Sequence, residues 1–176
     1  FRDYEYQSLG IEILNDMCDC DILMGIKEVP TTDLIENKTY LFFSHTIKKQ
    51  PYNRKLLQEV IRKKIRLIDY EAFKDKQGNR LVAFGRYAGI VGAYNGLWTY
   101  GKKFGGQVLR RAYECFDVNE LKLELRKLRL PAIKIILTGA GRVGKGAMET
   151  LDTAGIRKVN ASDFLSRKYE ERVYVQ

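Results

Sequence analysis

A glycine-rich turn that follows an apolar run constrains the fold more than any other feature of the sequence. The apolar run spans residues 133–137, and the turn reads Gly139-Ala140-Gly141-Arg142-Val143-Gly144. Where a strand leads through a G-x-G-x-x-G turn into a helix, the first glycine permits the tight turn and the second lets a pyrophosphate approach the backbone. The third lets the helix pack on the strand. The pattern therefore predicts the opening of a Rossmann dinucleotide-binding domain.

The same turn partly fits a second phosphate-binding pattern. Residues 139–145 also satisfy G-x-x-x-x-G-K, but Gly146 stands where the phosphate loop has the Ser or Thr that holds magnesium. The extra glycine at the dinucleotide spacing favours the first interpretation. The predicted cofactor-binding residues of the turn are Gly139, Gly141, Arg142, Val143 and Gly144. A turn that binds no nucleotide is the remaining alternative.

An acidic residue roughly 20 positions beyond such a turn normally holds the ribose hydroxyls of the cofactor. Asp163, 24 positions after Gly139, is the candidate for this role. Its alternative role is to cap a short helix together with Ser162. Arg157 and Lys158 also lie nearby in the sequence, so these residues leave the choice between NAD and NADP open.

The preceding part of the chain alternates strand-like and helix-like patterns. Strands are predicted for residues 11–14, 22–26, 39–43, 66–70 and 81–83, and helices for the stretch after Pro51 and for residues 117–130. Such alternation implies an α/β fold with a parallel sheet. Because the character of the sequence changes after Leu130, we expect a substrate domain over residues 1–130 and the first part of a Rossmann domain over residues 131–176.

Four glycines, at positions 85, 89, 92 and 96, recur at offsets that place them on one face of a helix. Each costs roughly 1 kcal/mol relative to alanine in a helix, so close packing against a neighbouring element is expected to offset the loss. An irregular loop over this stretch is the alternative.

Polar residues follow three of the predicted strands. Lys27 and Glu28 follow one strand, His45 a second and Glu71 a third. Ligands of open parallel sheets bind outside the carboxyl ends of the strands, and histidine is the side chain best suited to proton exchange near neutral pH. These four residues are therefore candidates for acid-base and substrate-binding roles. The alternatives are a surface ion pair for Lys27 and Glu28, a structural histidine, and a glutamate that is solvent-exposed or starts a helix.

Composition argues against several classes of protein. The net charge is +9, but the basic residues occur in several short clusters, with acidic residues interspersed among residues 122–129, as on solvated helix faces. A nucleic-acid partner is therefore disfavoured without being excluded. No apolar run approaches the roughly 18 residues of a membrane-spanning helix, so no membrane partner is expected. Three cysteines and one histidine favour neither a disulfide framework nor a zinc site, and we expect no metal and a cytoplasmic location.

Four short segments, taken in their order along the chain, resemble those of a known family. They are Asp21-Ile22-Leu23-Met24-Gly25-Ile26-Lys27-Glu28-Val29-Pro30, Phe43-Ser44-His45, Asp69-Tyr70-Glu71 and Phe84-Gly85-Arg86-Tyr87-Ala88-Gly89-Ile90-Val91-Gly92. Together they resemble the lysine-forming saccharopine dehydrogenases and, more distantly, alanine dehydrogenase and the soluble part of transhydrogenase.

The resemblance implies a two-domain enzyme with a cleft between the domains. It would oxidise saccharopine with NAD, hydrolyse the imine and release lysine and 2-oxoglutarate. Lys27 and His45 would form the acid-base pair, Glu28 and Glu71 would tune or orient them, and the three turn glycines would hold the pyrophosphate. The family's N-terminal strand, with a substrate-binding arginine, would precede Phe1, and the rest of the Rossmann domain would follow Gln176. We therefore expect the chain to be part of a longer protein and to be inactive alone.

Two other functions stay open at this point. In alanine dehydrogenases the lysine that matches Lys27 binds the keto acid, so an enzyme acting on pyruvate and ammonia is one alternative. A non-catalytic module that binds nucleotide or nucleic acid is the other. The expected partner is a small amino or keto acid, with homo-oligomerisation left open.

Overall fold

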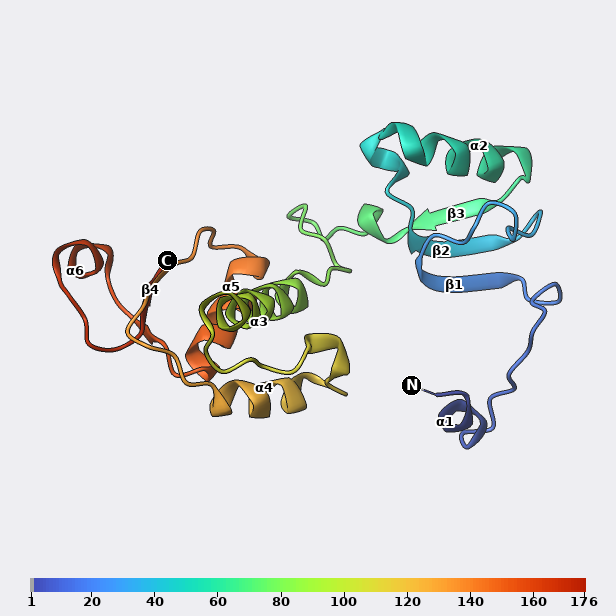
Figure 1. Ribbon diagram of the computed structural model, residues 1–176. Coiled ribbons are helices and arrows are strands. Elements are labelled where there is room, and N and C mark those ends of the chain that lie inside the picture. Colours follow the sequence, from blue (N-terminus) through green and yellow to red (C-terminus); the bar gives the residue numbers. More distant parts are fainter. Residues whose placement is uncertain (1) are drawn as a thin grey trace. The chain divides into compact units, whose positions relative to one another are not determined.

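A computed structural model describes residues 2–176 of the chain (Figure 1). The chain divides into two compact units, a first that ends at Ala83 and a second, Phe84–Gln176. Each unit has its own sheet, so each is described by itself. No helix within residues 2–176 combines the length and the apolar character that crossing a membrane requires.

The first unit is built on a three-stranded parallel sheet. Its elements are α1 (Asp3–Gln7), β1 (Ile22–Lys27), β2 (Thr39–Phe43), the 3₁₀ turns η1 (Thr46–Lys48) and η2 (Pro51–Asn53), α2 (Arg54–Arg62), β3 (Arg66–Asp69) and η3 (Tyr70–Ala72). The strand order is β1-β2-β3, and both neighbouring pairs are parallel. The α/β class and these three strands are as predicted.

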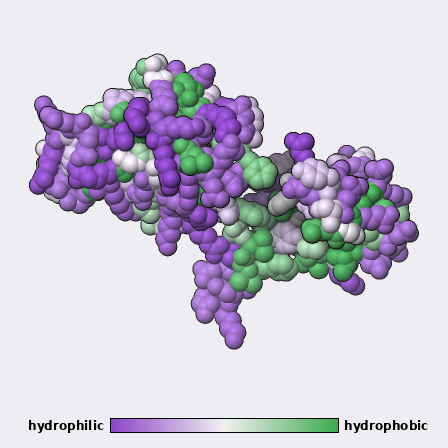
Figure 2. Space-filling model, turned by 90° about the horizontal axis from the view of Figure 1, so that it is seen from below, coloured by the Kyte–Doolittle hydropathy of each residue, from purple (hydrophilic) through white to green (hydrophobic). Residues whose placement is uncertain are grey.

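One face of this sheet holds the core of the unit. Leu56 and Val60 of α2 are buried against Tyr40 and Phe42 of β2, because the helical and strand periods turn these apolar side chains toward each other. On the opposite face, β1 exposes Ile22, Met24 and Ile26. Figure 2 shows the hydrophobic side chains that gather on the surface of this unit.

Two predicted strands of the first unit are wrong. Residues 11–14 form no strand and are exposed, because no neighbouring strand among residues 2–176 pairs with them. Residues 81–83 are also irregular: a turn at Gly78 leads into a single antiparallel bridge between Lys74 and Arg80. A short apolar run needs a pairing partner to become a strand, and periodicity alone does not supply one.

The second unit contains a second three-stranded parallel sheet. Its elements are α3 (Gly85–Phe104), η4 (Ala112–Glu114), α4 (Val118–Lys127), β4 (Lys134–Ile136), α5 (Arg142–Thr153), β5 (Arg157–Lys158), α6 (Ala161–Ser166) and β6 (Val173–Val175). The strand order is β4-β6-β5. The predicted strand, glycine turn and helix are thus confirmed as β4, the 139–144 turn and α5.

Helices α3 and α5 approach each other so closely that their backbones touch. A Cβ at Gly89 would lie 1.9 Å from the carbonyl oxygen of Val143, and a Cβ at Gly146 would lie 2.0 Å from the carbonyl oxygen of Arg86. The predicted glycine-faced helix is therefore confirmed, and Gly89 has the expected packing role. Gly92 and Gly96 instead face open space.

The packing of α3 also bears on the division of the chain. Helices α3 and α4 pack on α5, so both helices belong to the same compact unit as the glycine-rich turn. The functional division expected after Leu130 stays a prediction.

Candidate active site

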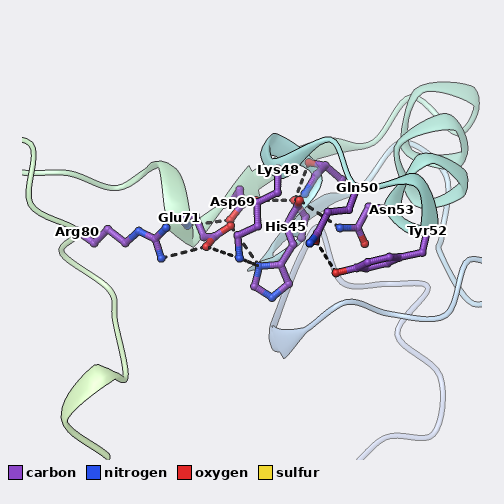
Figure 3. Close-up of polar contacts among 10 residues, drawn as sticks. His45, Lys48, Gln50, Tyr52, Asn53, Asp69, Glu71 and Arg80 are labelled. Carbon is purple, nitrogen blue, oxygen red and sulfur yellow. Dashed lines mark hydrogen bonds and ion pairs between the residues drawn. The ribbon is translucent and has the colours of Figure 1, made fainter. Parts of the chain in front are cut away.

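A buried carboxylate forms the centre of a polar cluster at the carboxyl edge of the first sheet. Glu71, in η3 directly after β3, is only 3% exposed. Its carboxylate lies 3.2 Å from Nδ1 of His45, 3.3 Å from Nζ of Lys48 and 3.0 Å from Nη1 of Arg80. Figure 3 shows these three side chains converging on Glu71, with His45 and Lys48 from one segment and Arg80 from another. The structure therefore brings together two of the predicted site residues, His45 and Glu71.

The backbone around His45 is fixed by buried polar side chains. His45 adopts a left-handed conformation with φ of 55°, which is uncommon for a residue other than glycine. The buried hydroxyl of Ser44 bonds to Asp69 and Thr46, and Asn53 donates to the carbonyl oxygen of His45 at 3.2 Å. These bonds fix the chain on either side of His45 and hold its backbone in this uncommon conformation, a feature that is often found at functional positions.

Asp69 links the histidine segment to the glutamate. Besides its bond to Ser44, it accepts a 2.8 Å hydrogen bond from the backbone amide of Glu71. One carboxylate at the end of β3 therefore positions both members of the His45–Glu71 pair.

The surroundings of Glu71 favour its charged form. Burial acts to raise the pKa of this carboxyl, but hydrogen bonds from His45 and Lys48 and the charges of Lys48 and Arg80 outweigh it. The pKa of Glu71 is therefore held below its ordinary value of 4.5. At neutral pH the group is a carboxylate that can orient and stabilise a cation.

This lowered pKa predicts an acid-labile cluster. A carboxyl whose pKa is lower in the folded state stabilises the fold above its unfolded pKa, and the stabilisation is lost as the pH falls through the folded value. We expect the urea midpoint to fall between about pH 5 and pH 3 and to fall less in Glu71→Gln, measured by circular dichroism. The exposed control Glu12→Gln should follow the wild type, and equal acid sensitivity of Glu71→Gln would contradict the assignment.

Lys27 and Glu28 lie at the same edge of the sheet but outside this cluster. Lys27 ends β1 and is paired in register with Phe43, two residues before His45. Both side chains are exposed, and neither forms an ion pair within residues 2–176. The surface ion pair considered as their alternative role is therefore not formed, and Lys27 presents its ammonium group to solvent on the strand next to His45.

Two cationic residues of the cluster were not predicted from the sequence. Lys48 follows His45 by three residues in a helical turn, a spacing that places both on one side and could have been noticed. Arg80 reaches Glu71 only because the Gly78 turn reverses the chain, and no periodic signal marks that contact.

The glycine-rich turn of the second unit has the geometry that its spacing predicts. Gly139 adopts a φ of +93°, which favours glycine, and a Cβ at Gly144 would lie 2.1 Å from the Gly139 carbonyl oxygen. No atom lies within 4 Å of a Cβ built on Gly141, so there is room for a ligand at the start of α5. Arg142 and Val143 begin that helix, whose first amides have no intrahelical partner. These features fit a dinucleotide pyrophosphate.

Helix packing disfavours the phosphate-loop alternative. That pattern needs a hydroxyl side chain at position 146, and any Cβ there would meet the Arg86 carbonyl oxygen at 2.0 Å. The glycine at this position is required by α3, so the magnesium-binding hydroxyl has no room.

Asp163 lies on α6 rather than directly after a strand. Asn160 caps this helix by accepting a 2.8 Å hydrogen bond from the Asp163 amide, and the Asp163 carboxylate pairs with Arg167 at 3.0 Å. This location differs from the strand end that a ribose-binding role requires.

Comparisons with known proteins agree with this architecture. A family model described as "Alanine dehydrogenase/PNT, N-terminal domain" matches residues 1–91. Alpha-aminoadipic semialdehyde synthase, mitochondrial, of Mus musculus is 34% identical, covering 86% of this chain and 18% of the relative. Saccharopine dehydrogenase [NAD(+), L-lysine-forming] of Neurospora crassa is 27% identical, covering 93% of this chain and 48% of the relative.

A solved structure supports the fold. An L-alanine dehydrogenase matches with a TM-score of 0.55 and 12% identity, over 100% of this chain and 48% of that one. The chain thus spans half or less of the length of these relatives. Since one of them is mitochondrial, the cytoplasmic location stays a prediction.

Proposed function

The chain belongs to the alanine dehydrogenase/PNT N-terminal domain family, and from this premise we propose that it is part of a nicotinamide-dependent amino-acid dehydrogenase. The proposed reaction is the oxidation of saccharopine, with water, to lysine and 2-oxoglutarate. The observation that carries the proposal is the buried Glu71 against His45 at the carboxyl edge of a parallel sheet. The name of the Neurospora crassa relative supports the choice of reaction.

The cluster suits the proton transfers of this reaction. Glu71 and Lys48 both contact Nδ1 of His45, which leaves Nε2 to exchange protons with a substrate. Lys27, at the end of the adjacent strand, supplies a second group that can give or accept a proton. We propose that these two residues form the acid-base pair, with Glu28 and Glu71 tuning or orienting them.

The proposed chemistry divides between the two sites. A nicotinamide dinucleotide bound at the glycine-rich turn would accept a hydride from the carbon of the C–N bond. One member of the acid-base pair takes the proton of the substrate amine as the imine forms. The other takes a proton from the attacking water, and a proton then returns to the lysine amine as the C–N bond breaks.

The test compares two substrate pairs in the full-length protein that carries this chain. We expect oxidation of the reduced nicotinamide cofactor with lysine plus 2-oxoglutarate and none with ammonium plus pyruvate, followed by absorbance of the cofactor. Turnover with ammonium and pyruvate alone would replace the proposal by an alanine dehydrogenase. Absence of both turnover and dinucleotide binding would favour a non-catalytic module.

A further inference from the structure

Helix α3 borders the first turn of α5, the helix that the glycine-rich turn leads into. A Cβ built on Gly85 would lie 3.0 Å from Cβ of Arg142 and 3.7 Å from the backbone nitrogen of Val143. One turn further along α3, Gly89 lies against the carbonyl oxygen of Val143. The backbone of α3 therefore runs beside the helix start at which the dinucleotide is proposed to bind.

A contact between two glycine-faced backbones does not by itself fix how far one helix slides along the other. Side chains that interdigitate as ridges and grooves normally fix this register, but Gly89 and Gly146 have no side chain to contribute. Polar side chains that cross from one helix to the other can supply the missing constraint. Such contacts join α3 and α5 here.

Arg86 and Glu149 form one of these contacts. Nε and Nη2 of Arg86, in the first turn of α3, donate to the two carboxylate oxygens of Glu149 on α5 at 2.9 and 2.8 Å. Lys122 of α4 contacts the same carboxylate at 2.8 Å. Hydrogen bonds from Arg86 and Lys122 hold the pKa of Glu149 below its ordinary value of 4.5. A bidentate pair with a third partner fixes geometry better than a single surface ion pair does.

Thr150 forms a second contact, one residue further along α5. It is only 2% exposed, and its hydroxyl donates to the carbonyl oxygen of Ile90 at 3.1 Å, with that of Gly146 at 3.4 Å. Arg86 and Ile90 lie one turn apart on α3, and their partners are adjacent on α5. The two contacts therefore fix the register of the helices.

We propose that Arg86, Glu149 and Thr150 are positioning residues for the dinucleotide, which they serve by fixing α5 against α3. Because α3 shares its core with Ile135 of β4 and Leu151 of α5, a shift of α5 along α3 also moves the turn between β4 and α5. The three residues thus act through the orientation of the turn rather than by touching the cofactor. The inference rests on the proposed function, since it concerns the cofactor site of that function.

Equilibrium binding of NADH to the full-length protein that carries this chain, followed by nicotinamide fluorescence, tests the inference. We expect Glu149→Gln and Thr150→Val each to raise the Kd of NADH by about fivefold to tenfold, as loss of a charged or buried hydrogen bond predicts. The kcat at saturating NADH should stay within about twofold of the wild type, because the acid-base pair is unchanged. Lys127→Gln, which breaks an ion pair with Glu124 inside α4, is the matched control and should leave the Kd unchanged.

A double variant tests whether Arg86 and Glu149 act as one unit. Arg86→Gln should raise the Kd as Glu149→Gln does, and the double variant should raise it no further than the larger single effect. Effects that multiply in the double variant would show that the two residues act independently and would overturn the pair as a positioning element.

The remaining outcomes separate this inference from the proposed function. An unchanged Kd in both Glu149→Gln and Thr150→Val would overturn the positioning role and leave the dehydrogenase proposal intact. A kcat that falls as much as the affinity, together with a lower melting temperature, would also overturn it, because the variants would then be losing the fold. Failure of the wild type to bind NADH would overturn the dehydrogenase proposal itself, and the positioning role with it.

Discussion

Alanine at Gly89 is expected to destabilise the second unit by about 3 kcal/mol, whereas alanine at Gly92, on the same face of α3, is expected to stabilise it by up to about 1 kcal/mol. At Gly89 the added Cβ would lie 1.9 Å from the Val143 carbonyl oxygen and 2.8 Å from the Ala147 amide. Both contacts are with backbone, so the helices must separate. At Gly92 nothing lies within 4 Å, and the substitution only restores helix propensity.

Thermal unfolding separates these two effects. The fluorescence of Trp98, the single tryptophan of the chain, reports on α3 directly. For a domain of this size each kcal/mol shifts the melting temperature by about 4–8 °C, so opposite shifts should be resolved easily. A similar loss in both variants would show that glycine is needed along the whole face, and a loss in neither would show that α3 and α5 are packed less closely than described.

The glycines of α3 show how much of the helix packing could be predicted from the sequence. Their spacing predicts one helix face and a close approach, and both are confirmed at Gly89. Which glycines are needed depends on the path of α5, which no local pattern encodes. Gly92 and Gly96 instead line an apolar cavity of about 700 Å³ beside β4. Sequence periodicity identified the face, and tertiary packing determined where along it contact occurs.

The candidate site shows the same division between local and long-range information. The rule that ligands bind at the carboxyl ends of parallel strands predicted that His45 and Glu71 share an edge, and the structure places them in contact. Arg80 could not be found this way because its contact depends on a chain reversal. Asp163 was chosen by counting residues along the chain; it lies on α6 and pairs with Arg167, and its ribose-binding role stays a prediction.

Loss of either member of the proposed acid-base pair is expected to lower kcat for saccharopine oxidation by about 10²- to 10⁴-fold. Lys27→Met keeps the length of an exposed side chain and removes its ionisable group. His45→Asn removes the imidazole while retaining a residue that tolerates the left-handed φ of 55°, so the fold should persist. The control is Lys76→Met in the exposed turn of the same unit, which should match the wild type.

The pH dependence of kcat/KM distinguishes acid-base chemistry from a structural role. The profile is expected to be bell-shaped, with an acidic and a basic limb. Removing a group that transfers protons should abolish one of these limbs, whereas a packing defect lowers the whole profile without changing its shape. We therefore expect each single variant to lose one limb, with a KM that changes far less than kcat. Activity of His45→Asn within about threefold of the wild type, with both limbs intact, would remove His45 from the mechanism and leave Glu71 with only Lys48 and Arg80 to orient.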